Sequence, residues 1–167
     1  MTAKEYNDCI RICADDVMQF AVRLCPDKAE CEDAVQEALA AMWTNRGKVG
    51  KEKGKSYLLS VTYRRLMSYF RRQSADRSYI ADAVATGNTT TAPAIYFDTT
   101  DAIEAALKSL PETQRAILQL RDVEGYSYHE IGETLELSDE KVQVYLFRAR
   151  VAMRKQLKSM GYDEYRQ

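Results

Sequence analysis

Hydrophobic residues recur every three or four positions along most of this chain, which is the spacing of amphipathic α-helices. The pattern predicts a helix over residues 4–24, which Pro26 ends, and a second helix over residues 27–43. A third helix is predicted over residues 56–72. Residues 45–55 hold three glycines and five cations, so we expect a loop there, outside the core.

Two short helices joined by a tight turn are predicted in the C-terminal part of the chain. Ser127 stands where an N-cap belongs, and Glu130 follows at the spacing of a capping box. Ser138 can cap the second helix, and Gly132 lies where the two helices would cross closely. The second helix has six basic residues and no acidic one over residues 141–158. They are Lys141, Arg148, Arg150, Arg154, Lys155 and Lys158. This arrangement is typical of a helix-turn-helix that enters the DNA major groove, although an ordinary helical hairpin with a solvated basic face shares the pattern.

The stretch between these parts has no hydrophobic period. Residues 73–99 are rich in Thr, Ala and Asp, which favours a flexible linker. We therefore expect an all-α fold of two small helical domains joined by a flexible linker, the C-terminal one a helix-turn-helix. The expected boundaries are residues 1–75 for the first domain, 76–99 for the linker and 100–167 for the second domain.

The overall composition is that of a globular protein. Hydrophobic residues make up 46% of the 167 residues, enough to bury a core. No apolar run approaches the roughly 20 residues that span a bilayer, and the N-terminus lacks the pattern of a signal peptide. We therefore expect a cytoplasmic protein.

Charge is arranged in blocks that the net charge of −1 conceals. Residues 1–45 carry 4 basic and 9 acidic groups, and residues 78–140 carry 3 and 12. Residues 46–77 carry 10 basic and 2 acidic groups, and residues 141–167 carry 7 and 2. Two basic blocks alternate with two acidic ones, which predicts local attraction to a polyanion and weak unspecific binding to DNA.

The first basic block combines cations with aromatic rings on its predicted third helix. The cations are Arg64, Arg71 and Arg72, and the rings are Tyr57, Tyr63 and Phe70. Such a mixture suits a nucleic-acid strand, because cations contact phosphates and rings stack on unpaired bases. The alternative is that the rings belong to the core.

Residues that could carry catalysis or bind a metal are scarce. The one histidine, His129, is expected to be solvated on the outer face of its helix. The four cysteines, Cys9, Cys13, Cys25 and Cys31, have a C-x3-C-x11-C-x5-C spacing that matches no common zinc module. We expect buried thiols, no cofactor, no metal and no enzyme activity. A redox- or metal-binding protein built on the cysteines is an alternative.

In this order the segments resemble the extracytoplasmic-function (ECF) sigma factors of bacterial RNA polymerase, which belong to the sigma-70 family. EDAVQEALAAMW resembles the helix with which the family binds core polymerase, and SYLLSVTYRRLMSYFRR resembles its promoter-melting helix. LPETQRAILQLRDVEGYSYHEIGETLELSDEKVQVYLFRAR follows the family's C-terminal pattern almost residue for residue. The resemblance covers nearly the whole chain, in two separate blocks.

The resemblance implies a sigma factor that binds core polymerase, recognises the upstream promoter hexamer with the helix-turn-helix and melts the downstream hexamer with the N-terminal domain. It implies polymerase contacts for Asp33, Gln36 and Glu37. Capture of a base flipped from the downstream hexamer is implied for the loop, whose cations are Arg46, Lys48, Lys51, Lys53 and Lys55. The opened strand would be held by Arg64, Arg71 and Arg72. The residues implied to face the upstream hexamer are Lys141, Gln143, Val144, Phe147 and Arg148.

Several positions depart from the family pattern. Glu136 stands in the turn where the family usually has Gly, and strain of roughly 1 kcal/mol is expected if its φ is positive. Tyr57, Arg64 and Ser68 replace residues that are often Trp, Asn and Asp, and Tyr145 stands where a cation is common. These departures bear on which bases are recognised.

A helix-turn-helix regulator that binds promoters without replacing a sigma subunit is a second alternative. Such a regulator would bind duplex DNA in the absence of polymerase. The sequence names neither the promoter nor the inducing signal. It also leaves open whether an anti-sigma protein or another mechanism holds the factor inactive.

Overall fold

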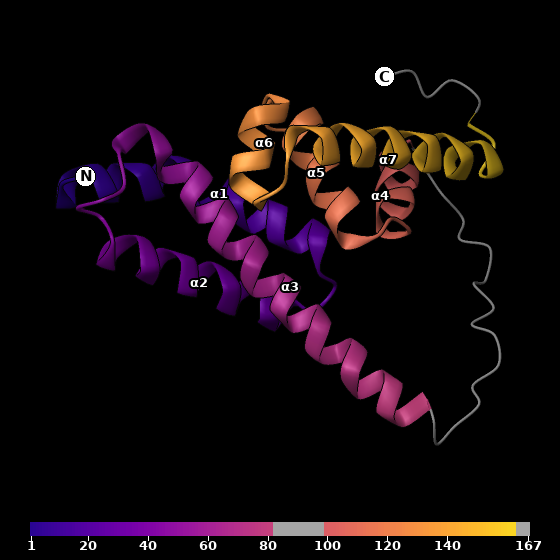
Figure 1. Cartoon of the computed structure of the whole chain (residues 1–167), viewed down its shortest axis with the longest axis horizontal. Coiled ribbons are helices and arrows are strands. Elements are labelled where there is room, and N and C mark those ends of the chain that lie inside the picture. Colours follow the sequence, from indigo (N-terminus) through magenta and orange to yellow (C-terminus); the bar gives the residue numbers. More distant parts are fainter. Residues whose placement is uncertain (82–98, 163–167) are drawn as a thin grey trace.

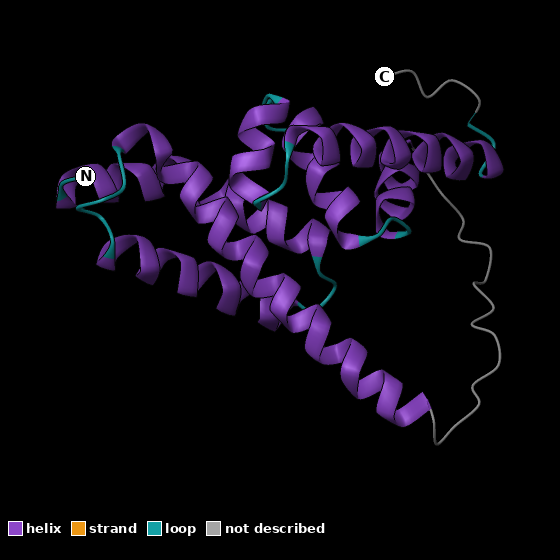
Figure 2. Cartoon of the chain, in the orientation of Figure 1, coloured by secondary structure: helices purple, strands orange, loops and turns teal. Residues whose placement is uncertain are grey.

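The computed structural model describes residues 1–81 and 99–162. Within these residues the secondary structure is helical, without strands (Figure 2). The elements are α1 (Ala3–Leu24), α2 (Lys28–Thr44), the 3₁₀ turn η1 (Lys51–Lys53), α3 (Gly54–Ala81), α4 (Thr99–Lys108), α5 (Glu112–Asp122), α6 (Tyr128–Leu135) and α7 (Asp139–Ser159). The predicted all-α fold is confirmed. None of the described helices is long and apolar enough to cross a membrane.

The first three helices form an N-terminal bundle. The side chain of Asp27 accepts a hydrogen bond from the Glu30 amide and caps α2, as the sequence predicts. Each helix turns an apolar stripe inward, and α3 packs against both α1 and α2. The largest fully buried side chains of this bundle are Val17, Leu24, Met42, Leu58, Leu59 and Leu66.

The last four helices form a C-terminal bundle in which α7 packs against α4, α5 and α6. Ile117, Leu120, Ile131, Leu146 and Met153 are fully buried in it. The short helix α6 and the long helix α7 are joined by a tight turn (Figure 1). This is the predicted helix-turn-helix.

The two bundles pack directly against each other, with α4 and α5 on α1 and α6 on α3. The guanidinium of Arg115 is buried at this junction, where Nη1 donates a hydrogen bond to the Leu24 carbonyl across the contact. Nε of Arg115 donates to the Leu107 carbonyl at 2.9 Å within its own bundle. The hydroxyls of Tyr63 and Thr113 lie 3.1 Å apart and form a second bond between the bundles. A hydrogen-bonded contact therefore fixes the position of the helix-turn-helix relative to α3.

One predicted helix boundary is wrong. α3 begins at Gly54 and continues to Ala81, so residues 73–81, predicted as the start of the linker, are helical. The end of this helix extends beyond the bundle (Figure 1), past the residues whose hydrophobic period the prediction used. Residues 82–98 of the predicted linker lie outside the described residues. Helix α5 begins at Glu112, with Pro111 as its N-cap residue.

Candidate polymerase and nucleic-acid interfaces

The predicted polymerase-binding residues share an exposed face of α2. Asp33, Gln36 and Glu37 are all exposed, and their i, i+3, i+4 spacing places them side by side. One carboxylate is partly engaged, because Nε of Arg65 donates to Glu37 at 2.7 Å. Nη2 of Arg65 also lies 3.9 Å from Glu30. Arg65 therefore links this exposed acidic face of α2 to α3.

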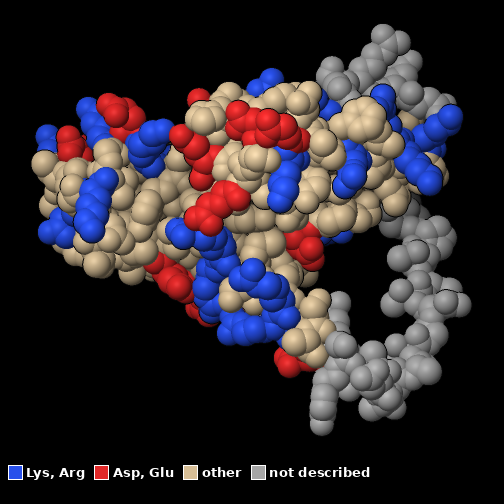
Figure 3. Space-filling model, in the orientation of Figure 1, with Lys and Arg blue, Asp and Glu red and all other residues tan. Residues whose placement is uncertain are grey.

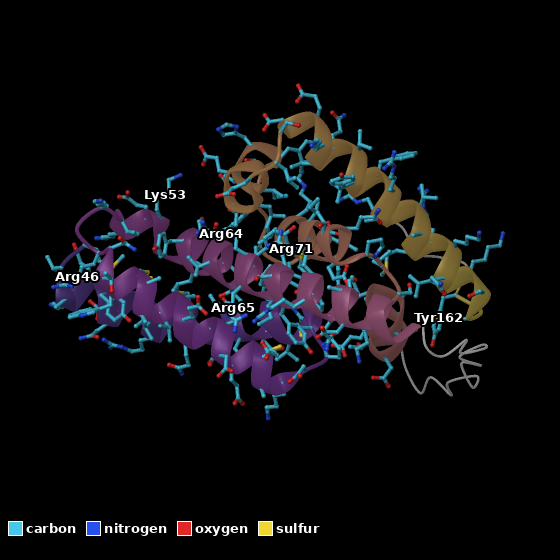
Figure 4. All side chains as sticks on the ribbon, turned by 60° about the horizontal axis from the view of Figure 1, so that its bottom comes forward. Arg46, Lys53, Arg64, Arg65, Arg71 and Tyr162 are labelled. Atoms are coloured by element: carbon cyan, nitrogen blue, oxygen red, sulfur yellow. The ribbon has the colours of Figure 1, made fainter. Side chains whose placement is uncertain are left out.

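Arg65 is a residue that the sequence prediction missed. It follows Arg64 directly, yet it lies about 100° further round the helix. In Figure 4 it points toward α2, whereas Arg64 lies on the side of the C-terminal helices. No local pattern separates two neighbouring arginines in this way, because only the packing of α3 against α2 decides which one forms the ion pair with Glu37.

The loop after α2 is built around hydrogen-bonded polar and aromatic groups. The Asn45 side-chain amide donates to the Ala41 carbonyl and to the Tyr57 hydroxyl, both at 3.0 Å. The Arg46 guanidinium lies 3.9 Å from the centre of the half-exposed Trp43 ring, in a cation–π contact. Neither Trp43 nor Asn45 was among the predicted site residues.

The lysines of the loop differ in their surroundings. Lys48 and Lys51 are exposed. Lys53 Nζ lies 3.5 Å from a Glu133 carboxylate oxygen on α6. Lys55 Nζ lies 2.8 Å from Asp16 and also contacts Glu124. Desolvation lowers the pKa of Lys55, but its hydrogen bonds to the two carboxylates outweigh this and raise the pKa above its ordinary value.

The cations of α3 lie where the sequence predicts. Arg64, Arg71 and Arg72 are exposed, and Figure 4 shows Arg64 and Arg71 on the side that faces the C-terminal helices. Arg64 Nη1 lies 3.7 Å from a Glu136 carboxylate oxygen. Figure 3 shows Lys and Arg gathered over the second half of α3 and along α7, with Asp and Glu over α6 between them.

The aromatic residues of α3 divide between the two predicted roles. Tyr63 is only 7% exposed and belongs to the core, so the prediction that it lies beside the cations as a stacking ring is wrong. Its hydroxyl lies 3.1 Å from the hydroxyl of Thr113 on α5, at the contact between the bundles. Tyr57 and Phe70 are half-buried and keep part of each ring accessible. Only these two therefore remain candidates for stacking on bases.

The helix-turn-helix has the predicted caps. Ser127 and Glu130 form a reciprocal capping box, and Ser138 accepts a hydrogen bond from the Lys141 amide. A Cβ on Gly132 would lie 2.5 Å from the Leu137 carbonyl oxygen, so the close approach of the turn requires glycine. Glu136 ends α6 with φ 58° and ψ 48°, which confirms a strained left-handed residue in this turn.

The outward face of α7 is open. Its predicted DNA-contacting residues, Lys141, Gln143, Val144, Phe147 and Arg148, are all exposed. Phe147 is 67% exposed and Val144 45%, which is unusual for apolar side chains on a packed helix. Arg150 is engaged instead, because its Nη2 donates to Asp122 at 3.1 Å. One of the six cations of this helix therefore links α7 to α5.

The thiols lie in the N-terminal bundle, and Cys9 and Cys13 line a pocket that Lys51 and Lys55 also line. Cys13, Cys25 and Cys31 are buried, and Cys9 is half-buried. Burial raises the pKa of Cys13 and of Cys31 to about 12, so these thiols stay protonated near neutral pH. No group of three or more metal-ligating side chains occurs within the described residues. His129 is exposed, as predicted.

Two family matches divide the chain at the same place as the two bundles. Residues 9–75 match Sigma-70 region 2, and residues 100–153 match Sigma-70, region 4. The ECF RNA polymerase sigma factor SigX of Bacillus subtilis (strain 168) is 28% identical over 151 residues, which cover 85% of this chain and 78% of that protein. The chain belongs to the ECF sigma factors of the sigma-70 family.

Further relatives of this sigma factor agree with that membership. SigW of the same Bacillus strain is 24% identical over 168 residues, covering 93% of this chain and 90% of that protein. The sigma factor RpoE, solved in complex with the anti-sigma factor NepR from Bartonella quintana, has a TM-score of 0.74 at 21% identity. That likeness covers 93% of this chain and 98% of RpoE and concerns the fold.

Membership of this family gives the function of the chain in general terms. It is a DNA-binding transcription initiation factor that directs RNA polymerase to promoters. The matches favour this function over that of a regulator that does not replace a sigma subunit.

Proposed function

We propose that this sigma factor divides promoter recognition between its two basic surfaces. In this proposal α7 binds the upstream hexamer as duplex, and the loop with α3 holds the opened strand of the downstream hexamer. The contrast between the surfaces carries the proposal. α7 presents exposed side chains on one capped helix, whereas the loop and α3 combine cations with half-buried rings.

The α7 surface suits duplex recognition. Lys141, Val144 and Arg148 lie three and four positions apart and therefore share one face of the helix. An arginine can donate two hydrogen bonds to O6 and N7 of guanine in the major groove. Exposed apolar groups such as Val144 and Phe147 suit contact with a thymine methyl group. In the proposal Arg148 carries the largest share of base discrimination.

The loop and α3 suit an unpaired strand. Lys48, Lys51 and Arg71 supply exposed charge for phosphates, and the partly accessible ring of Tyr57 is available for stacking. The Tyr57 hydroxyl is held by Asn45, so the ring keeps a defined orientation. We propose that a flipped base binds beside this pair.

Core polymerase is proposed to bind the exposed acidic face of α2, at Asp33, Gln36 and Glu37. In this arrangement the chain acts through binding, and the polymerase supplies the catalysis. The proposal also places the chain in the cytoplasm, where bacterial transcription occurs. An anti-sigma protein is a proposed second partner, because the similar RpoE structure was solved bound to one.

Run-off transcription tests this function. The purified chain is added to core polymerase with a library of promoter fragments. We expect specific transcripts whose templates share an upstream hexamer and a downstream hexamer. A protein that shifts duplex DNA without polymerase, but supports no transcript from core polymerase, would instead be a regulator of another class.

A further inference from the structure

Three cations that are proposed to bind DNA already face carboxylates of the same chain. Lys53 lies opposite Glu133, and Arg64 lies opposite Glu136. Lys55 contacts Glu124, which precedes α6. The cations belong to η1 and α3, and the carboxylates belong to the C-terminal bundle. The charge of the nucleic-acid surface is therefore partly balanced across the contact between the bundles.

The Lys53–Glu133 pair borders a cleft with a volume of about 400 Å³. Lys48, Tyr57 and Ser60 line it on one side, and Glu130 and Glu133 line it on the other. The Tyr57 ring, beside which a flipped base is proposed to bind, thus lies at a cleft whose far wall is acidic. A DNA phosphate that entered this cleft would be repelled by the carboxylates of α6.

Glu136 links this acidic wall to a strained backbone position. It is the only non-glycine residue with positive φ among those the structure describes. Glycine adopts this conformation without strain, whereas a side chain does not. The side chain present reaches Arg64 on α3. Its strain is therefore accompanied by an ion pair that glycine could not make.

The acidic wall is held in place by contacts that do not depend on these ion pairs. Arg115 donates a hydrogen bond to the Leu24 carbonyl, and Tyr63 bonds to Thr113. Both bonds join the bundles away from the cleft, so the position of α6 relative to α3 does not depend on the ion pairs at the cleft. The Lys53–Glu133 and Arg64–Glu136 pairs are exposed, and each is individually weak in water, whereas Lys55 and Glu124 are largely shielded. In the two exposed pairs the carboxylate can therefore be exchanged for another anion.

We propose that the acidic edge formed by Glu124, Glu133 and Glu136 is a docking surface for the basic strand-binding surface of the same chain. Bound there, it competes with DNA phosphates for Lys53, Lys55 and Arg64. The inference rests on the proposed strand-binding function and adds to it a competition between carboxylates of the chain and phosphates of the DNA. The free protein would then bind single strands weakly, and separation of α6 from α3 would expose the full surface.

The test measures binding of the full chain to a fluorescent single-stranded oligonucleotide by anisotropy. The variant Glu133→Gln/Glu136→Gln removes two carboxylates while keeping the side-chain shape. The matched control, Asp15→Asn/Glu32→Gln, removes the same charge from exposed positions outside the cleft. We expect the first variant to bind about three- to tenfold more tightly than the control, the range that two exposed ion pairs support. Equal affinity of the two variants would overturn the inference.

A second variant separates this effect from any change in folding. Glu136→Gly removes one carboxylate and relieves the positive φ, so it should raise the melting temperature and also tighten strand binding. A variant that melts higher but binds the oligonucleotide no better than wild type would contradict the docking surface. Arg64→Ala, made in the Glu133→Gln/Glu136→Gln background, tests the underlying function. If it leaves strand binding unchanged, the proposed role of Arg64 fails, whatever the carboxylates do.

Discussion

The two basic surfaces of this sigma factor carry charge of the same sign but in different settings. On α7, Arg148 and its neighbours face solvent from one capped helix. On η1 and α3, Lys53, Lys55 and Arg64 face carboxylates of the other bundle. Basic charge alone therefore does not tell which surface is ready to bind. The α7 surface is accessible as it stands, whereas in our proposal Lys53, Lys55 and Arg64 exchange carboxylates of the chain for DNA phosphates.

The largest expected effect concerns the proposed polymerase-binding face of α2, because neither basic surface can act at a promoter unless the chain binds polymerase. Replacing Asp33, Gln36 and Glu37 with alanine should abolish co-purification with core polymerase. Each exposed change should alter the free energy of unfolding by under about 0.5 kcal/mol, because Arg65 keeps Glu30 as a partner when Glu37 is lost. Asp15→Ala, which removes an exposed carboxylate from α1, is the matched control. Co-purification of the triple variant at the wild-type level would contradict the proposed polymerase surface.

Arg148→Ala should affect the α7 surface alone. We expect weaker recognition at one position of the upstream hexamer, by about 1–3 kcal/mol at the matching base pair. Binding of the holoenzyme to hexamer variants, compared position by position, measures this loss. Arg154→Ala removes an exposed cation further along the same helix and serves as the control. A loss spread evenly over all hexamer variants would mean that Arg148 contacts phosphate.

Replacing Lys48, Lys51 and Lys53 with alanine should affect the other surface. We expect slower open-complex formation on every promoter, since phosphate contacts carry no sequence information. Each lost contact should also reduce the slope of log K against log salt by about 0.7 to 0.9. The triple variant of Lys4, Lys28 and Lys108 removes equal charge elsewhere and should leave both quantities unchanged. Promoter-dependent slowing would count against the assignment.

Gly132→Ala tests whether α7 depends on the turn for its presentation. The new Cβ would lie 2.5 Å from the Leu137 carbonyl oxygen, and overpacking of this kind destabilises by about 1–3 kcal/mol. Thermal unfolding should show the loss, together with weaker upstream recognition. Gly47→Ala places its Cβ in open space and should melt like wild type. Equal melting temperatures for the two variants would show that the turn adjusts without cost.

The smallest expected effect concerns the thiols. Changing Cys9 and Cys25 to serine should leave run-off transcription close to wild type, because Cys25 is buried and neither thiol is among the residues proposed to bind polymerase or DNA. Transcription and elemental analysis together test this expectation. Stoichiometric zinc that disappears with activity in the double variant would favour the redox- or metal-binding alternative.

The sequence predicted those features that depend on neighbouring residues. Ser127 with Glu130, and Gly132 with its close turn, follow from contacts a few positions apart, and the structure contains them. The exposed face of α7 was predicted for the same reason. The helical period also identified which sides of α1 and α2 are buried, although it assigned Tyr63 to the wrong surface.

Features that depend on contacts between the bundles were not predicted. The pairs Lys53–Glu133 and Arg64–Glu136 join residues more than 70 positions apart, and no local pattern aligns them. Tyr63 is buried at the contact between the bundles, where its hydroxyl meets that of Thr113, and the sequence of its own helix does not reveal this. Residues 73–81 of α3 were missed because the predicted helix ended where the hydrophobic period ends, whereas α3 continues beyond the bundle. The strain at Glu136 was expected, but its ion pair was not.

The division of recognition between the two surfaces is tested most directly on two templates, a duplex promoter and the same promoter pre-melted over the downstream hexamer. Permanganate footprinting measures the opened strand with Arg148→Ala and with the triple variant of Lys48, Lys51 and Lys53. The division predicts that the Arg148→Ala defect largely disappears on the pre-melted template, because opening no longer depends on upstream recognition. It predicts that the lysine variant stays defective there, since the strand must still be held. An Arg148→Ala defect that is as large on the pre-melted template as on duplex would contradict it.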